Sequence, residues 1–292
     1  MFDKINEFIC NSYVNEVDSK KDRSIDTFYP SQASCVNLLT GKIEGTCARA
    51  LYYDFTKAQL TNPPSPSSIR KMKYGNKIED YEVECLKGMN ICVSTQTSFE
   101  KIYETIKIRG KVDAIIEYED LFNDKEYVCL EYKSSGGYYF KNLVFGTAKV
   151  NGFPKISNLM QAMIYVDAFK NHETFKFNKC YLMYIDRESC NNKSFKIELT
   201  DEGFPKIDGD EFKALNIKSI YERYKYLNKH LILNILPKRD FRPEIDIATC
   251  EQENEQGIIS DSMLRNFKQY GKGIDVMCQF CNYKNLCIKE GK

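Results

Sequence analysis

Residues 110–135, GKVDAIIEYEDLFNDKEYVCLEYKSS, decide the fold that this sequence predicts. Two runs rich in Val, Ile, Leu and Tyr, 105–118 and 126–135, are typical of β-strands. The segment FNDKE between them carries the Asn and Asp that favour a turn. The two runs are therefore expected to pair as neighbouring strands of a hairpin.

Charged residues stand inside these otherwise apolar strands. Glu131 and Lys133 are two positions apart, a spacing that points both side chains to one face of a strand. Asp113 lies beside them if its strand is the hairpin neighbour. Two carboxylates bind Mg²⁺ or Mn²⁺, the backbone carbonyl of Tyr132 adds another oxygen ligand, and a lysine stabilises charge during phosphodiester hydrolysis. The pattern predicts a metal-dependent nuclease site, although a surface ion pair on a strand gives the same letters.

The other helices and strands follow from hydrophobic periodicity and turn residues. The proline- and serine-rich segment 61–68 predicts a loop whose Ser65 or Ser67 caps the next helix. This order predicts an α/β fold with a mixed central sheet and helices on both faces, built as a single domain over residues 1–292. The expected elements are a helix, three strands, a helix, a strand and a long helix, at about residues 68–89, 91–99, 105–118, 126–135, 154–169, 179–186 and 211–236.

The composition excludes several classes of protein. No run approaches the roughly 18 apolar residues of a membrane span, and the first residues lack the apolar stretch of a signal peptide. We therefore expect a cytoplasmic protein with no membrane partner. The net charge of +1 neither favours nor excludes nucleic acid, because a binding groove needs only local positive charge. No phosphate-cradling GxxxxGK[ST] loop occurs, so a nuclease on this chain has no helicase motor of its own.

Three of the 12 cysteines end the chain in the spacing C-x2-C-x5-C, as Cys278, Cys281 and Cys287. Such a spacing lets three thiolates converge on one centre, and a tetrahedral centre needs a fourth ligand, for which Cys47 is the candidate. In a reducing compartment, clustered cysteines favour a metal over disulfides. Zinc and an iron–sulfur cluster both suit four thiolates.

Together these motifs resemble the RecB-like nucleases of the PD-(D/E)XK superfamily. They cover residues from about 30 to 290. They most resemble the iron–sulfur exonucleases of the fourth CRISPR-associated protein family, whose cluster pattern AddB-type recombination nucleases and related phage proteins share. The features that carry the resemblance are, in chain order, Cys47 with Arg49 and Tyr52–Tyr53; Gly75 with acidic residues one turn later; Gly110 with Asp113; Glu131, Tyr132 and Lys133; Gln161 and Tyr165 in the pattern Q-x3-Y; and the closing cysteines.

The resemblance implies a role for each residue of the acidic motif. Asp113 and Glu131 would bind the catalytic Mg²⁺ or Mn²⁺, and Lys133 would assist the attacking water. Gln161 and Tyr165 would support the site or the DNA.

The resemblance also implies how the chain is divided. A restriction-endonuclease-like core would span about residues 66–200, and a helical iron–sulfur subregion would form from about 30–60 and 205–292. A 4Fe–4S cluster, structural first, would be held there by Cys47, Cys278, Cys281 and Cys287.

One position departs from the family pattern. The family's first motif usually carries a histidine ligand about four residues after its glycine, where this chain has Glu79. Glu79 would replace that histidine as an oxygen ligand, which favours a hard ion. Alternatively the site is weakened, and Glu82 one turn later is a second candidate. The two histidines, His172 and His230, lie elsewhere and are interpreted as surface or structural residues.

A loop rich in Gly, Tyr, Phe and Lys follows the catalytic strand and offers a path for DNA. Tyr138 and Tyr139 present faces on which bases stack, and Lys141 and Lys149 meet phosphates. An aromatic loop packed on its own core is the alternative. Arg49 is a further basic candidate.

The sequence thus predicts a metal-dependent DNA exonuclease that acts on single-stranded ends. The family resemblance implies 5′→3′ polarity and a role in CRISPR adaptation or in phage or recombination DNA processing. A CRISPR integrase or recombination proteins are the implied partners. The alternatives are a nuclease subunit of a recombination helicase complex, a DNA-end-binding protein whose site is inactive, and a structural module held by zinc.

Overall fold

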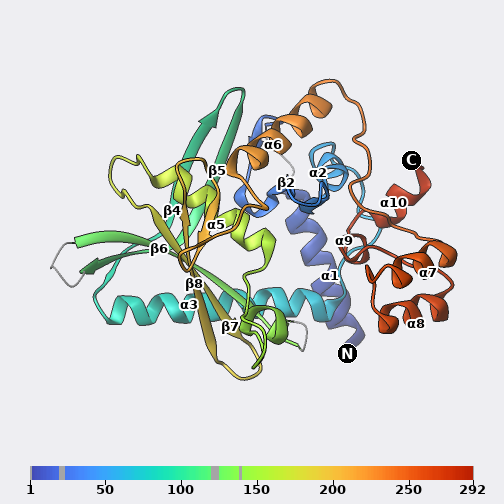
Figure 1. Ribbon diagram of the computed structural model, residues 1–292, viewed down its shortest axis with the longest axis horizontal. Coiled ribbons are helices and arrows are strands. Elements are labelled where there is room, and N and C mark those ends of the chain that lie inside the picture. Colours follow the sequence, from blue (N-terminus) through green and yellow to red (C-terminus); the bar gives the residue numbers. More distant parts are fainter. Residues whose placement is uncertain (1, 20–23, 120–124, 138–139, 292) are drawn as a thin grey trace. The chain divides into compact units, whose positions relative to one another are not determined.

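The computed structural model describes residues 2–19, 24–119, 125–137 and 140–291 (Figure 1). The chain forms two compact units. The first comprises Met1–Arg23, Thr46–Ile69 and His230–Lys292, and the second comprises Ser24–Gly45 and Arg70–Lys229.

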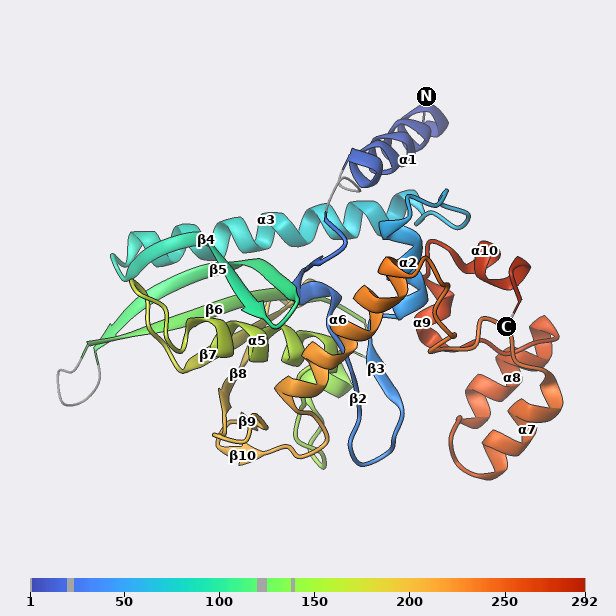
Figure 2. The same cartoon turned by 90° about the horizontal axis from the view of Figure 1, so that it is seen from above.

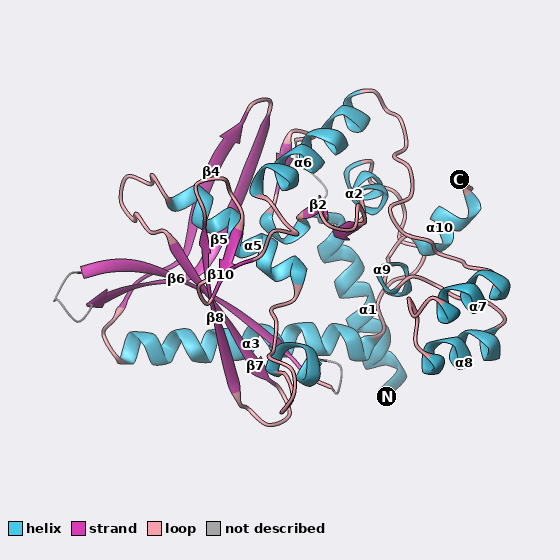
Figure 3. Ribbon diagram, in the orientation of Figure 1, coloured by secondary structure: helices cyan, strands magenta, loops and turns pink. Residues whose placement is uncertain are grey.

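The second unit is built on a curled mixed sheet of eight strands, drawn in magenta in Figure 3. The strand order is β1-β5-β6-β7-β8-β9-β10, with β4 paired to β5. The β1–β5 and β6–β7 pairs are parallel, and the other pairs are antiparallel. The strands are β1 (Thr27–Phe28), β4 (Cys92–Tyr103), β5 (Ile106–Glu119), β6 (Lys125–Ser135), β7 (Lys179–Asp186), β8 (Asn192–Leu199), β9 (Pro205–Ile207) and β10 (Asp210–Glu211).

Helices flank this sheet, as seen from a second direction in Figure 2. Helix α3 (Pro66–Gly88) packs Ile78, Val83 and Leu86 against a cluster that includes Val128 and Leu130 of β6. Helix α5 (Ile156–Phe169) is almost entirely buried and packs on β7 and β8, which explains its nearly unbroken apolar sequence. The other elements of this unit are the short turns η1 (Pro30–Gln32) and η2 (Lys141–Phe145), the strand pair β2 (Ser34–Val36) and β3 (Ile43–Gly45), and most of helix α6 (Ile217–Ile232).

The first unit is helical. Its elements are α1 (Phe2–Ser19), α2 (Ala48–Phe55), α7 (Ile247–Glu255), α8 (Asp261–Tyr270), α9 (Val276–Gln279) and α10 (Lys284–Lys289). Across the described parts of the chain, none of the helices combines the length and apolar character that crossing a membrane requires.

The predicted class is confirmed: a mixed α/β fold with a mixed sheet flanked by helices. The first predicted helix begins slightly earlier than expected, at Pro66, because the Ser65 hydroxyl accepts the Ser68 N–H at 3.2 Å and so caps it. The predicted long helix begins later than expected, at Ile217, where the Asn216 side chain accepts the Lys218 N–H at 2.9 Å. Its predicted first residue, Glu211, is instead the last residue of strand β10.

The predicted division of the chain has different bounds from the two compact units. Residues 30–45 and 205–229, expected in the cysteine-bearing subregion, cluster with the sheet. Among the described residues before Thr46, the chain forms helix α1 and the short strands β1, β2 and β3.

Gly110 of β5 provides a test of this packing. A Cβ built there lies 2.8 Å from the Phe99 ring and 3.0 Å from Pro30, both well inside ordinary contact. Gly110→Ala is therefore expected to destabilise the fold by about 1–3 kcal/mol through overpacking, measured by denaturant unfolding. Gly88→Ala is the matched control, since a Cβ at Gly88 meets nothing within 4 Å and alanine favours the helix. Equal stabilities for the two variants would contradict the packing described.

Candidate functional site

The candidate site forms where two strands of the sheet part. The β5–β6 ladder runs from Glu119 opposite Lys125 to Ala114 opposite Leu130, where the pairs end. Asp113 is the next residue of β5. Its carboxylate accepts the backbone N–H of Tyr132 at 2.8 Å. A side chain thus takes over the hydrogen bond that the ladder stops supplying.

Glu131 lies at the centre of this region and is only 1% exposed. Its Oε1 atom accepts hydrogen bonds from Lys133 Nζ at 2.5 Å and from Gln161 Nε2 at 2.6 Å. The same Gln161 nitrogen lies 2.6 Å from the Tyr165 hydroxyl, which donates to the Lys111 carbonyl at 3.0 Å. The predicted helical face of Gln161 and Tyr165 therefore meets the predicted carboxylate directly.

The second oxygen of Glu131 is in a different situation. Among the described residues, Glu131 Oε2 is buried and has no hydrogen-bond partner. A buried carboxylate oxygen without a partner costs free energy, which a cation or a proton would recover.

Glu79 reaches the same region from helix α3. Its carboxyl is half-buried and in hydrogen-bonding contact with that of Asp113. Its Oε1 atom accepts from Gln96 Nε2 at 3.0 Å. Glu82, the other acidic candidate, lies instead by the Tyr132 ring, where burial first and then its charge raise the pKa of the phenol. Of the two candidates, Glu79 is the one that joins Asp113.

Burial and mutual repulsion disturb the ionisation of these carboxyls. Burial raises the pKa of Glu131 to about 8, against the opposing effect of the Lys133 ammonium. Burial and then the Asp113 charge raise the pKa of Glu79 to about 7. Burial lowers the pKa of Lys133, but Glu131 and Asp113 outweigh it and the net shift is upward. The site therefore places the carboxyls of Glu79, Asp113 and Glu131 near the Lys133 ammonium, and two of these carboxyls hold protons more tightly than usual.

The donor set suits a hard divalent cation. Three carboxyls from α3, β5 and β6 supply oxygen atoms, which Mg²⁺ and Mn²⁺ prefer, and one of those oxygens is buried without a partner. In the part of the chain that the structure describes, however, no three His, Cys, Asp or Glu side chains are already spaced to hold a metal ion. The backbone N–H of Tyr132, whose carbonyl is the predicted ligand, already donates a hydrogen bond to Asp113.

The predicted DNA-binding residues are scattered. Tyr138 and Tyr139 lie outside the described residues. Lys141 Nζ pairs with Glu188 at 2.8 Å and with Asp186 at 3.4 Å, and Lys149 is exposed.

The expectation that Arg49 meets DNA is not supported, because its side chain is only 3% exposed. Its Nε atom donates to the Pro237 carbonyl at 2.7 Å, and Nη1 donates to the Gly291 carbonyl at 3.0 Å. These bonds commit the guanidinium to the interior of the helical unit.

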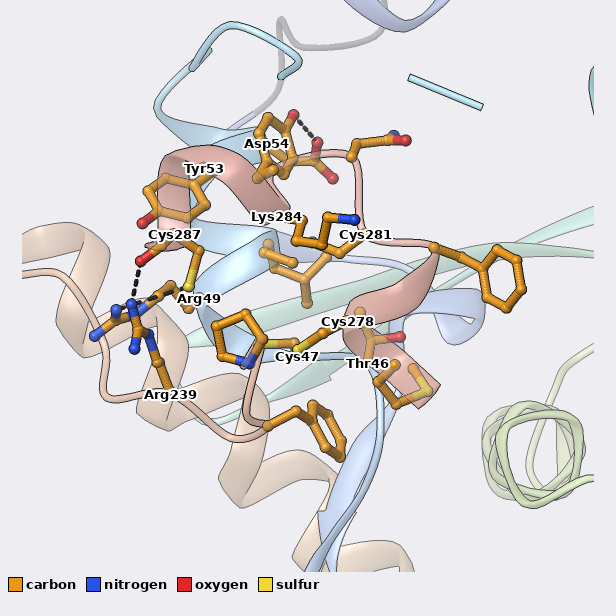
Figure 4. A pocket seen from close by; sticks show the side chains of 18 residues that line it. Thr46, Cys47, Arg49, Tyr53, Asp54, Arg239, Cys278, Cys281, Lys284 and Cys287 are labelled. Carbon is orange, nitrogen blue, oxygen red and sulfur yellow. Dashed lines mark hydrogen bonds between the residues drawn. The ribbon is translucent and has the colours of Figure 1, made fainter. Parts of the chain in front are cut away.

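The four predicted cysteines, together with Arg49, line one cavity of about 200 Å³ in the helical unit (Figure 4). Cys47 and Cys278 lie side by side in Figure 4, with Cys287 next to Arg49 and Cys281 next to Lys284. Burial, followed by the charges of the other three cysteines, Cys47 first, raises the pKa of Cys278 to about 12. Cys47 caps helix α2, and although backbone N–H groups of Arg49 and Ala50 favour its thiolate, burial raises its pKa to about 11.

The walls of this cavity are joined by polar contacts. The Arg49 Nη1 atom lies 3.9 Å from Cys287 Sγ. The Tyr53 hydroxyl donates to Glu290 at 2.5 Å, and Tyr283 donates to Asp54. The Asn62 side chain donates to the Cys281 carbonyl at 2.9 Å. Four thiols and a neighbouring guanidinium are thus among the groups that line the cavity.

Two residues of the sheet site escaped the sequence motifs. Tyr184 stands opposite Lys133 on β7, and its hydroxyl accepts from Lys155 N and Asn158 Nδ2, both at 3.0 Å. Gln96 belongs to β4 and contacts Glu79. Neither lies in a recognisable motif, and the parallel pairing of β6 with β7 was the only signal that would have found Tyr184.

Comparison with known proteins adds little. No family model matches the chain, and no curated protein does. Among solved structures it is similar to the crystal structure of SSO0001, at 19% identity and a TM-score of 0.45, over 79% of this chain and 86% of that one. A likeness of this size supports no transfer of function.

The raised pKa of Glu131 predicts how stability depends on pH. The folded protein holds this proton up to about pH 8, whereas the unfolded chain releases it near its ordinary value of 4.5, so stability falls as pH rises between them. Glu131→Gln cannot ionise. In chelator it is expected to exceed the wild type by on the order of 2 kcal/mol at pH 8, and to match it near pH 4.

Urea unfolding between pH 4 and 8 measures this difference. Glu100→Gln, which removes an exposed partner of Arg109 on β4, is the control and should leave the pH dependence unchanged. Parallel pH profiles for Glu131→Gln and the wild type would contradict the burial argument.

Proposed function

We propose that this chain is a Mg²⁺- or Mn²⁺-dependent deoxyribonuclease with a RecB-like PD-(D/E)XK core and a 4Fe–4S cluster at its four cysteines. The observation that carries the proposal is the environment of Glu131. Its buried carboxylate shares one oxygen between Lys133 and Gln161 and leaves the other without a partner beside Asp113. A surface ion pair on a strand would leave its carboxylate in contact with solvent, whereas Glu131 is 1% exposed.

In this proposal the carboxylates of Glu79, Asp113 and Glu131 hold the cation. A divalent cation bound there supplies Lewis acidity and neutralises charge that develops on a phosphodiester. Gln161 fixes the rotamer of Glu131 through Oε1, so that Oε2 faces the ligand position. Tyr165 fixes Gln161 in turn.

Lys133 has a separate role. Its raised pKa keeps the ammonium charged at neutral pH, and the side chain is 28% exposed, so it is accessible to a substrate. When Glu131 engages a cation, the ammonium is released to donate hydrogen bonds to a phosphate oxygen or to the attacking water. The Tyr184 ring beside it limits the directions in which Lys133 can turn.

The cysteine cavity supports the second half of the proposal. Its lining includes Cys47 of one chain segment and the three C-terminal cysteines, the residues that a four-thiolate centre would use. We assign this centre a structural role, tying residues 46–69 to residues 230–292 within the helical unit. Zinc is the competing ion, and metal analysis with visible absorption distinguishes the two.

The substrate and its context follow from the family resemblance. We propose 5′→3′ action on single-stranded DNA ends in CRISPR adaptation or phage recombination, with Lys141 and Lys149 as candidate phosphate contacts. One alternative keeps the nuclease chemistry: the chain is the nuclease subunit of a recombination helicase complex. The other alternative has no nuclease activity: the chain is a DNA-end-binding protein with a weakened site.

End-labelled DNA tests the proposal. Single- and double-stranded DNA carrying 5′ or 3′ labels is incubated with Mg²⁺ or Mn²⁺ and the purified holoprotein. The wild type is expected to shorten single strands from the 5′ end, and Glu131→Ala and Lys133→Ala to reduce the rate by about 10²-fold or more. Equal cleavage by wild type and both variants would sink the nuclease proposal, while DNA binding without cleavage would favour the end-binding alternative.

The cysteine centre makes a prediction about stability. Cys281→Ser removes one of the four ligands, and since a ligated centre contributes folding free energy, the melting temperature is expected to fall by about 10 °C or more. Cys190→Ser is the control, because Cys190 is an exposed cysteine outside the cavity. An unchanged melting temperature in Cys281→Ser, with its metal content intact, would rule out the structural role.

A further inference from the structure

One strand residue next to the acidic site has an unusual backbone conformation. Gln96 lies in β4 with φ of +49°, the left-handed region that side chains other than glycine rarely adopt. The other described non-glycine residues with positive φ occupy turns or loops, and Gln96 alone lies inside a strand. Such strain costs about 1–2 kcal/mol and persists where the surroundings impose it, often at functional sites.

The position of Gln96 in the sheet relates this strain to the site. The β4–β5 ladder pairs Thr95 with Ala114 and Thr97 with Val112, so Gln96 stands opposite Asp113. The side chain leaves the strand toward helix α3 and donates its amide N–H to Glu79 Oε1 at 3.0 Å. One residue thus connects the strand that faces Asp113 with the helix that carries Glu79.

We propose that Gln96 is a positioning residue that holds Glu79 in place as a cation ligand. The inference rests on the proposed function and extends it to the position where the family pattern has a histidine. An imidazole ligand is rigid and needs one partner for its second nitrogen. A glutamate side chain has three rotatable bonds, and the Gln96 amide restricts that freedom by holding Oε1 of the half-buried Glu79 carboxyl, which also contacts Asp113.

The backbone strain has a role in this arrangement. A regular strand conformation at Gln96 would direct its side chain along the alternation of β4. The left-handed conformation redirects the amide so that it reaches helix α3. The strained backbone lowers the stability of the fold but holds Glu79 ready to bind a cation. Removing the strain together with the amide is therefore expected to maintain or raise stability and to lower cation affinity.

Gln96→Gly tests the inference because glycine tolerates the left-handed conformation and has no amide. The probe is Mn²⁺ alone, titrated without DNA into the holoprotein by calorimetry. The variant is expected to keep a melting temperature at or above that of the wild type and to bind Mn²⁺ about tenfold more weakly. In a Glu79→Gln background the same substitution should weaken binding no further.

Ser98→Gly, two residues along β4, is the control and should leave the Mn²⁺ affinity unchanged. If the wild type binds Mn²⁺ and cuts DNA, and the Gln96→Gly variant binds Mn²⁺ with equal affinity, the positioning role is overturned. The proposed function would still stand. An equal loss in the Glu79→Gln background would also overturn it. A wild type that neither binds Mn²⁺ nor cuts DNA would overturn both.

Discussion

The structure around the sheet depends on one costly feature, a carboxylate buried in an apolar strand. Strand β6 carries Val128, Cys129 and Leu130 into the core, and Glu131 continues that run at 1% exposure. A charge in such a place must find partners or take up a proton, and Glu131 does some of each. Lys133 and Gln161 donate hydrogen bonds to one carboxylate oxygen, Oε1. Burial of the group still raises its pKa, because these two bonds do not offset the loss of solvent.

The geometry of the sheet follows this requirement. If β5 and β6 stayed paired past Ala114, Asp113 would have no backbone N–H to accept. The strands part there, and the freed Tyr132 N–H holds Asp113 close to Glu131. Helix α5 then covers the face that bears Glu131: Gln161 donates to the carboxylate, and Tyr165, one turn later, contacts Gln161. The polar groups of the region therefore form a connected chain in an apolar setting.

Much of this arrangement was predictable because it is periodic. Alternation within two strands placed Asp113, Glu131 and Lys133 on shared faces, and helical spacing paired Gln161 with Tyr165. What depends on irregular backbone or long-range packing was not predictable. The burial of Arg49 depends on carbonyls 188 and 242 residues away in sequence, at Pro237 and Gly291. Strand β1, which pairs in parallel with β5, has only two residues and is too short to show an alternating pattern in the sequence.

A glutamate at position 79, where the family that the sequence resembles usually has a histidine, would change the charge of the proposed site as well as its shape. With a neutral imidazole at this position, the site would have two carboxyls, Asp113 and Glu131, and one ammonium, Lys133. Glu79 adds a third carboxyl, and burial followed by the Asp113 charge raises its pKa to about 7. At neutral pH the metal-free site therefore retains protons that a divalent cation must displace. A carboxylate oxygen also lacks the preference of imidazole for softer ions, so a glutamate ligand at this position would favour Mg²⁺ and Mn²⁺. A site built this way depends more on the groups that orient its carboxyls, because flexible and mutually repelling ligands gain more from preorganisation than a rigid ring does.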